Sequence, residues 1–93
     1  MARTIHRLSP AAVRNAKPGM HADGGGLYLQ ATASTDGINR SWIFRFVLNK
    51  GRERHMGLGS LQSVSLAEAR AAAAGARKLT GQGIDPIEAR NAQ

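Results

Sequence analysis

Cysteine is absent from this 93-residue chain, so neither a disulfide framework nor a thiolate metal site can stabilise it. Aromatic residues are few (one tryptophan, one tyrosine and two phenylalanines), and six acidic residues face thirteen lysines and arginines, for a net charge of +7. No apolar run approaches the roughly 18 residues of a membrane-spanning helix. We expect one small cytoplasmic domain with a modest core and no membrane segment. Its charge favours a polyanionic partner such as nucleic acid over a basic surface kept only for solubility.

The segment 41–59 predicts a β-hairpin with one buried side. Apolar side chains fall at every second position on both arms: Trp42, Phe44, Phe46, Leu48, Met56 and Leu58. Residues 49–52, Asn-Lys-Gly-Arg, have the chemistry of a turn between the two arms. Residues 40–54 carry five basic residues: Arg40, Arg45, Lys50, Arg52 and Arg54. We therefore expect the core and the densest positive charge on opposite sides of one hairpin.

A further strand and two turns precede this hairpin. Residues 27–31, Leu-Tyr-Leu-Gln-Ala, alternate apolar and polar side chains and predict a half-buried strand. Residues 22–26 contain three glycines and are interpreted as a flexible turn. A phosphate-binding loop is disfavoured, because these glycines open a strand rather than a helix. Residues 32–40 are expected to form a loop around Asp36-Gly37. The sequence leaves open whether the N-terminal region adds a small extra strand.

Two helices complete the predicted α+β fold. Ser65 and Glu68 have the spacing of a capping box, and the following helix should bury Leu66 and an alanine stripe. A short helix should run from Pro10 to about Ala16 behind an N-cap at Ser9. The prediction is a three-stranded antiparallel β-sheet packed against one long C-terminal α-helix, with a short N-terminal helix. Residues 1–7 form a flexible basic arm and residues 8–83 the folded domain. On the long helix we expect a solvated basic face, made of Arg70, Arg77 and Lys78.

The sheet face opposite the helix is the candidate binding surface. Alternation places seven residues there: Tyr28, Gln30, Ile43, Arg45, Val47, Glu53 and His55. Arg45, at its centre, has the donors for a bidentate pair with guanine, Gln30 can address adenine, and Tyr28 can contact a phosphate or a thymine methyl group. Four further residues, at the edges and the hairpin tip, are expected to hold the phosphate backbone: Arg40, Lys50, Arg52 and Arg54.

The sequence offers little for other classes of function. The three histidines are scattered and lack carboxylate company, so no metal or cofactor is expected. No nucleophile–base set or pair of carboxylates suggests an enzyme. Two alternatives stay open. Trp42 and Phe44 could stack on unpaired bases of RNA or single-stranded DNA. The chain could also be a protein-interaction domain whose charge is incidental.

Four segments in order resemble a known family: LSPAAVRNAKPG, DGGGLYLQATASTDGINRSWIFRF, GRERHMGLGSLQSVSLAEARAAA and GQGIDP. Over roughly Leu8 to Pro86 the chain resembles the N-terminal arm-type DNA-binding domain of prophage and genomic-island tyrosine recombinases, the phage-type integrases. The resemblance implies that the open sheet face enters the major groove of double-stranded arm-type sites during DNA integration and excision.

The resemblance also implies a tyrosine nucleophile in a separate C-terminal domain of the parent enzyme. Tyr28, the only tyrosine, does not match that nucleophile's motif, so this chain is expected to bind rather than catalyse. Residues 84–93 would begin a linker to core-binding and catalytic domains. Other integrase subunits would be partners of the full-length protein, and the isolated domain is expected to be a monomer.

Overall fold

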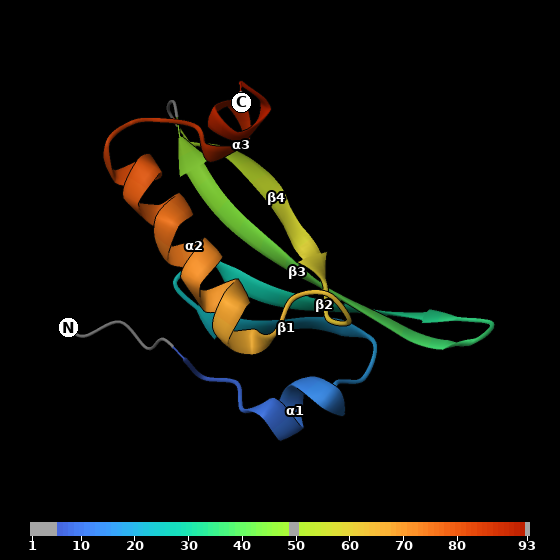
Figure 1. Cartoon of the computed structure of the whole chain (residues 1–93). Coiled ribbons are helices and arrows are strands. Elements are labelled where there is room, and N and C mark those ends of the chain that lie inside the picture. The colour runs from blue at the N-terminus through green and yellow to red at the C-terminus, as the bar shows by residue number, and fades with distance from the viewer. Residues whose placement is uncertain (1–5, 49–50, 93) are drawn as a thin grey trace.

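The computed structural model describes residues 6–48 and 51–92, which form an antiparallel sheet with helices packed against it (Figure 1). The elements in this part of the chain are α1 Pro10–Arg14, β1 Gly19–Gly24, β2 Leu27–Ser34, β3 Gly37–Leu48, β4 Arg52–Ser60, α2 Leu66–Gly81 and α3 Pro86–Asn91. The strands lie in the order β1-β2-β3-β4, so each pairs with its neighbour in sequence. The α+β class and the antiparallel sheet are confirmed.

The predicted count of three strands is wrong, because the described residues contain four. β1 pairs with β2 from Gly19↔Ala31 to Gly24↔Leu27, with a bulge between Ala22 and Gly24. Its residues, Gly-Met-His-Ala-Asp-Gly, hold only two apolar side chains, Met20 and Ala22, too few to indicate a strand from the sequence. Three helices rather than two occur in the same part of the chain, since α3 follows α2.

The predicted loop at residues 32–40 is also wrong. β2 and β3 pair without interruption from Leu27↔Phe44 to Ser34↔Gly37, and only residues 35–36 form the turn. In Figure 1 this hairpin projects well beyond the layer formed by α2. Most of its outer residues are exposed, so nothing selects the alternation by which a half-buried strand is recognised. The predicted turn at 49–52 includes residues 49–50, which lie outside the described residues.

The core lies between one face of the sheet and α2, as the alternation predicts. Trp42, Phe44 and Phe46 are buried from the sheet side, and Ala69 and Ala73 from α2. Further buried residues complete this cluster: Val13, Ala16, Leu27, Leu29, Ala31 and Ala76. Alanine lets the helix approach the sheet closely, and the aromatic rings fill the space between them. Within the described residues, no helix is long and apolar enough to cross a membrane.

Hydrogen bonds fix the starts of α1 and α2. Ser65 accepts from the Glu68 backbone N–H while the Glu68 carboxylate accepts from the Ser65 backbone N–H, so the predicted capping box is confirmed. Ser9 accepts from the Ala12 N–H at the start of α1, as expected for an N-cap. The indole Nε1 of Trp42 donates to the Val64 carbonyl at 2.8 Å, which connects β3 to the residue before the N-cap of α2.

A buried ion pair joins the N-terminal segment, β1 and α2. Asp23 is only 1% exposed, and both its carboxylate oxygens accept hydrogen bonds from Arg70, at 2.9 Å each. Asp23 Oδ1 also accepts from the Leu8 N–H, and Arg70 Nη2 donates to the Leu8 carbonyl. The prediction that Arg70 and Arg77 lie on a solvated face is therefore wrong. Arg77 donates to the Gly25 carbonyl, so both arginines bind the segment that contains β1.

We expect the domain to lose stability in acid because of this pair. Burial by itself raises the pKa of Asp23, but hydrogen bonds from Arg70 and the Leu8 N–H and the charge of Arg70 outweigh it, so the pKa lies below its ordinary value. Since the folded-state pKa is depressed, the stabilisation is complete above about pH 4 and is lost as the pH falls through the folded-state value. Asp85 adds to the effect: burial by itself raises its pKa, but hydrogen bonds from the start of α3 and from Arg54 outweigh burial, so this pKa also lies below its ordinary value.

Urea unfolding at a series of pH values measures this dependence. The free energy of unfolding should be nearly constant from pH 5 to 7 and fall steeply below about pH 4. An Asp23→Asn variant should be less stable at neutral pH and show a shallower fall. A wild-type profile that stays flat through pH 3 would contradict the assignment.

Candidate nucleic-acid interface

The face of the sheet turned away from α2 presents a row of polar and aromatic side chains. On β2, β3 and β4 the described residues of this face are exposed or half-buried, as predicted: Tyr28, Gln30, Ile43, Arg45, Val47, Glu53 and His55. The strand register explains the grouping, because Tyr28 pairs with Ile43, Arg45 with His55, and Val47 with Glu53. We call this surface the open face.

Arg45 lies at the centre of the open face and is in contact with two neighbouring side chains, Tyr28 and Glu53. Its Cζ lies 5.1 Å from the centroid of the Tyr28 ring, in the range of a cation–π contact. Its Nε lies 3.5 Å from Glu53 Oε2, and His55 Nε2 lies 3.7 Å from the same oxygen. The backbone N–H of Arg45 donates to the Gly26 carbonyl at 2.8 Å. A single arginine is thus fixed at its backbone and bordered by an aromatic ring and a carboxylate.

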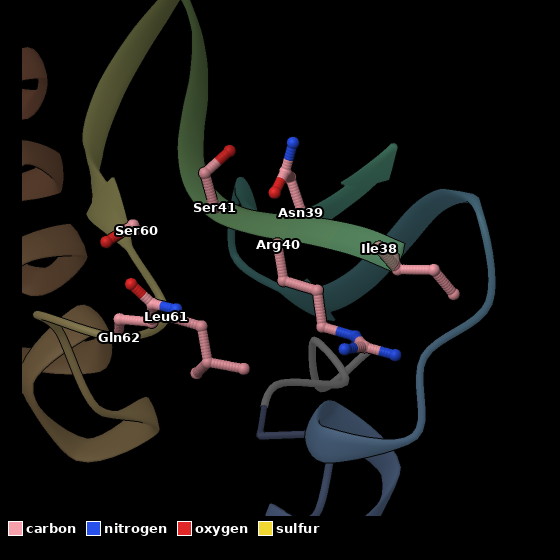
Figure 2. Close-up of a pocket in the computed structure, with 7 residues that line it drawn as sticks. All are labelled: Ile38, Asn39, Arg40, Ser41, Ser60, Leu61 and Gln62. Carbon is pink, nitrogen blue, oxygen red and sulfur yellow. The ribbon is translucent and has the colours of Figure 1, made fainter. Parts of the chain in front are cut away.

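The structure does not bring Arg40 to the open face. Figure 2 shows the Arg40 side chain leaving β3 on the side opposite to Asn39 and Ser41, towards the α1 segment. Its Nε and Nη2 donate to the Ala16 carbonyl at 3.1 and 2.7 Å. Arg40 therefore holds the end of the α1 segment against the sheet. The shallow hollow next to it, of about 360 Å³, is lined by β3 and the end of β4.

Arg54 also lies on the helix side of the sheet. Its Nη1 donates to Asp85 Oδ2 at 2.6 Å, and Asp85 caps α3 by accepting from the Ile87 and Glu88 N–H groups. Arg54 thereby connects β4 to the start of α3. Arg52 is exposed at the start of β4. Lys50, expected at the hairpin tip, lies outside the described residues.

β1 adds residues to the open face that the sequence did not indicate. Met20 pairs with Gln30 and Ala22 with Tyr28, so these side chains continue the face by one strand. Met20 is 49% exposed. On the projecting hairpin Thr32 and Asn39 pair and extend the same face with polar groups. The sequence does not indicate these residues, because β1 has only two alternating apolar side chains and residues 32–40 predict a loop around Asp36-Gly37.

The two residues proposed for stacking on unpaired bases lie in the core instead. Trp42 is 0% and Phe44 2% exposed, and both pack under α2. A single-strand or RNA platform needs exposed aromatic rings, so this alternative loses the side chains on which it depended. Residues 6–48 and 51–92 contain no group of three or more histidine, aspartate or glutamate side chains placed to hold a metal ion.

Fold and surface together define a small α+β module with one sheet face packed on a helix and the other exposed around an arginine. The family model of the arm DNA-binding domain matches residues 8–93, nearly the whole chain. The chain therefore belongs to the arm DNA-binding domain family, which is typical of phage integrases. Members of this class are DNA-binding rather than catalytic domains. A comparison with curated proteins found no match.

Proposed function

We propose that this domain binds double-stranded DNA in a sequence-specific way, with the open face in the major groove of an arm-type site. The observation that carries the proposal is the position of Arg45, half exposed at the centre of the face that α2 leaves uncovered. A two-stranded β-ribbon fits the major groove, where base edges present distinct patterns of donors and acceptors. An exposed arginine there has the geometry to bind guanine O6 and N7.

The contact set proposed from the structure is narrower than the one expected from the sequence. Tyr28, Gln30, Arg45 and His55 share the open face and form its base-reading part. Arg52 is exposed at the edge of β4 and suits a phosphate contact, while Lys50 stays in the set on its sequence alone. Arg40 and Arg54 are left out, because their guanidinium groups already bind Ala16 and Asp85.

We further propose that the chain is the N-terminal domain of a prophage-encoded tyrosine recombinase that acts in the bacterial cytoplasm in DNA integration and excision. The family match and the order of the four sequence segments support this context. The catalytic domain would lie elsewhere in the parent protein, other integrase subunits would be partners, and the isolated domain would be monomeric.

A salt titration of binding tests the proposal. The 93-residue chain is used to select a preferred duplex from a randomised pool, and its affinity for that duplex and a scrambled one is then measured from 50 to 300 mM salt. Each phosphate contact should contribute about −0.9 to the slope of log K against log salt. Arg45→Ala should reduce the preference for the selected duplex about tenfold, the order expected for one bidentate base contact.

Lys78→Ala is the matched control, because it removes one positive charge from the exposed side of α2. It should lower affinity for both duplexes equally and leave the preference unchanged. If Arg45→Ala behaves like Lys78→Ala, the open face is an electrostatic clamp rather than a reader of sequence. If neither duplex binds at 50 mM salt, the DNA-binding proposal fails and the protein-interaction alternative replaces it.

A further inference from the structure

The carboxylate of Glu53 is the one acidic group among the open-face residues on β2, β3 and β4, and its position is unexpected for a surface that faces DNA. A carboxylate close to phosphates weakens binding by repulsion. Glu53 nevertheless lies beside Arg45, with Oε2 3.5 Å from Arg45 Nε and 3.7 Å from His55 Nε2. This inference rests on the proposed function and concerns the same surface.

The atoms in contact determine which part of Arg45 remains available. A guanidinium has five N–H donors, and a bidentate pair with guanine needs only two neighbouring ones. Glu53 approaches Arg45 at Nε, the nitrogen nearest the main chain, and the Tyr28 ring lies 5.1 Å from Cζ. The terminal nitrogens Nη1 and Nη2 are left for a base edge. Ring and carboxylate together limit the orientations of a side chain that is otherwise long and mobile.

The pair contributes little to the fold itself. The Arg45 and Glu53 side chains are 50% and 45% exposed, and exposed ion pairs add little to stability. Glu53 can therefore be replaced without unfolding the domain. Its placement is better explained by what it does to Arg45 than by what it does for the sheet.

We propose that Glu53 is a positioning residue, which holds Arg45 against Tyr28 so that the terminal guanidinium nitrogens point at a guanine edge before DNA arrives. Preordering one long side chain removes part of the entropy that binding would otherwise lose. The carboxylate weakens affinity for any DNA through repulsion and raises the preference for the correct site. Glu53 thus lowers the affinity for DNA in general and raises the preference for the correct site.

Glu53→Gln separates these effects, because it removes the charge and keeps the size. Affinity for a scrambled duplex should rise slightly, since one negative charge is lost from the interface. The ratio of affinities for the selected and scrambled duplexes should fall about fivefold, as expected when one long side chain must be ordered on binding. Glu88→Gln is the matched control: it removes the same charge from exposed α3, away from the open face, and should leave the ratio unchanged. Thermal unfolding of each variant checks that the fold is intact.

The outcomes distinguish this inference from the proposed function. If Arg45→Ala abolishes the preference while Glu53→Gln keeps or increases it, Glu53 is only a repulsive charge, and the inference fails while the proposed function stands. If the wild-type chain binds selected and scrambled duplexes equally, sequence reading itself fails and the inference falls with it. Selection from the randomised pool should be repeated with Glu53→Gln and with Arg45→Ala. At the position where Arg45→Ala loses the preference for guanine, Glu53→Gln should show a weaker preference for guanine than wild type.

Discussion

Replacement of Asp23 with alanine should lower the free energy of unfolding by about 3 kcal/mol, because the guanidinium of Arg70 is left without its carboxylate. The pair joins β1 to α2, and Asp23 accepts three hydrogen bonds, two from Arg70 and one from the Leu8 N–H. For a chain of this length the loss corresponds to a decrease in melting temperature of about 15 °C. Urea unfolding and calorimetry at pH 7 measure both quantities.

Asp36→Ala is the control for this experiment. Asp36 is exposed in the turn between β2 and β3, so the same chemical change should alter the free energy of unfolding by less than about 0.5 kcal/mol. Asp23→Asn, which retains an acceptor for the Leu8 N–H but not the charge, should lie between wild type and Asp23→Ala. Equal effects of Asp23→Ala and Asp36→Ala would show that the buried pair has no special part in stability.

Gly26→Ala should destabilise the domain by about 3 kcal/mol, through backbone strain and overpacking together. Gly26 has a φ of +92°, and a Cβ there would lie 2.6 Å from the Arg45 carbonyl oxygen and 2.9 Å from Phe44 Cε1. Its own carbonyl accepts from the Arg45 N–H. The substitution should therefore move the backbone that carries Arg45 and also reduce the preference for a selected duplex.

Gly83→Ala separates strain from contact. Gly83 has a φ of +78°, close to that of Gly26, but a Cβ would meet no atom within 4 Å. Gly83→Ala should lower the free energy of unfolding by about 1 kcal/mol, the contribution of the left-handed backbone alone, and leave the preference for the selected duplex unchanged. Chemical denaturation of both variants gives the comparison. If both substitutions lower the free energy of unfolding by the same amount, the close contact at Gly26 has no effect on stability, and the prediction is wrong.

Side-chain alternation was enough to predict the two faces of the sheet. Trp42, Phe44 and Phe46 are buried as expected, and Arg45 is exposed between them. This succeeds because the side-chain period of a strand decides which residues share a face without any knowledge of the partner strand. The caps at Ser9 and Ser65 were predictable for a similar reason, since they depend on spacing within a few residues.

Long-range polar contacts could not be predicted in this way. Asp23 lies in a glycine-rich segment that resembles a turn, yet its partner Arg70 is 47 positions further along the chain. Arg40 and Arg54 lie on the core side of the sheet, where Arg40 donates to the Ala16 carbonyl and Arg54 to the Asp85 carboxylate. From sequence alone, a basic residue near a candidate binding face is predicted to contact DNA. Whether it instead binds another part of the chain depends on the tertiary fold. Alternation therefore predicts which residues share the open face, but not which basic residues at its edges bind other parts of the chain. The contacts with DNA stay predictions.

The stripe of buried alanines on α2 has a consequence for how the helix is aligned. Ala69, Ala73 and Ala76 present a smooth surface, and without large side chains to interlock, such a surface would let a helix slide or rotate on its sheet with little loss of apolar contact. Directional bonds are what define a single alignment: Arg70 binds Asp23 of β1, Arg77 binds the Gly25 carbonyl just after β1, and Trp42 of β3 binds the Val64 carbonyl. In this domain, burial of apolar side chains holds α2 on the sheet, and the hydrogen bonds of its arginines select one alignment of the helix.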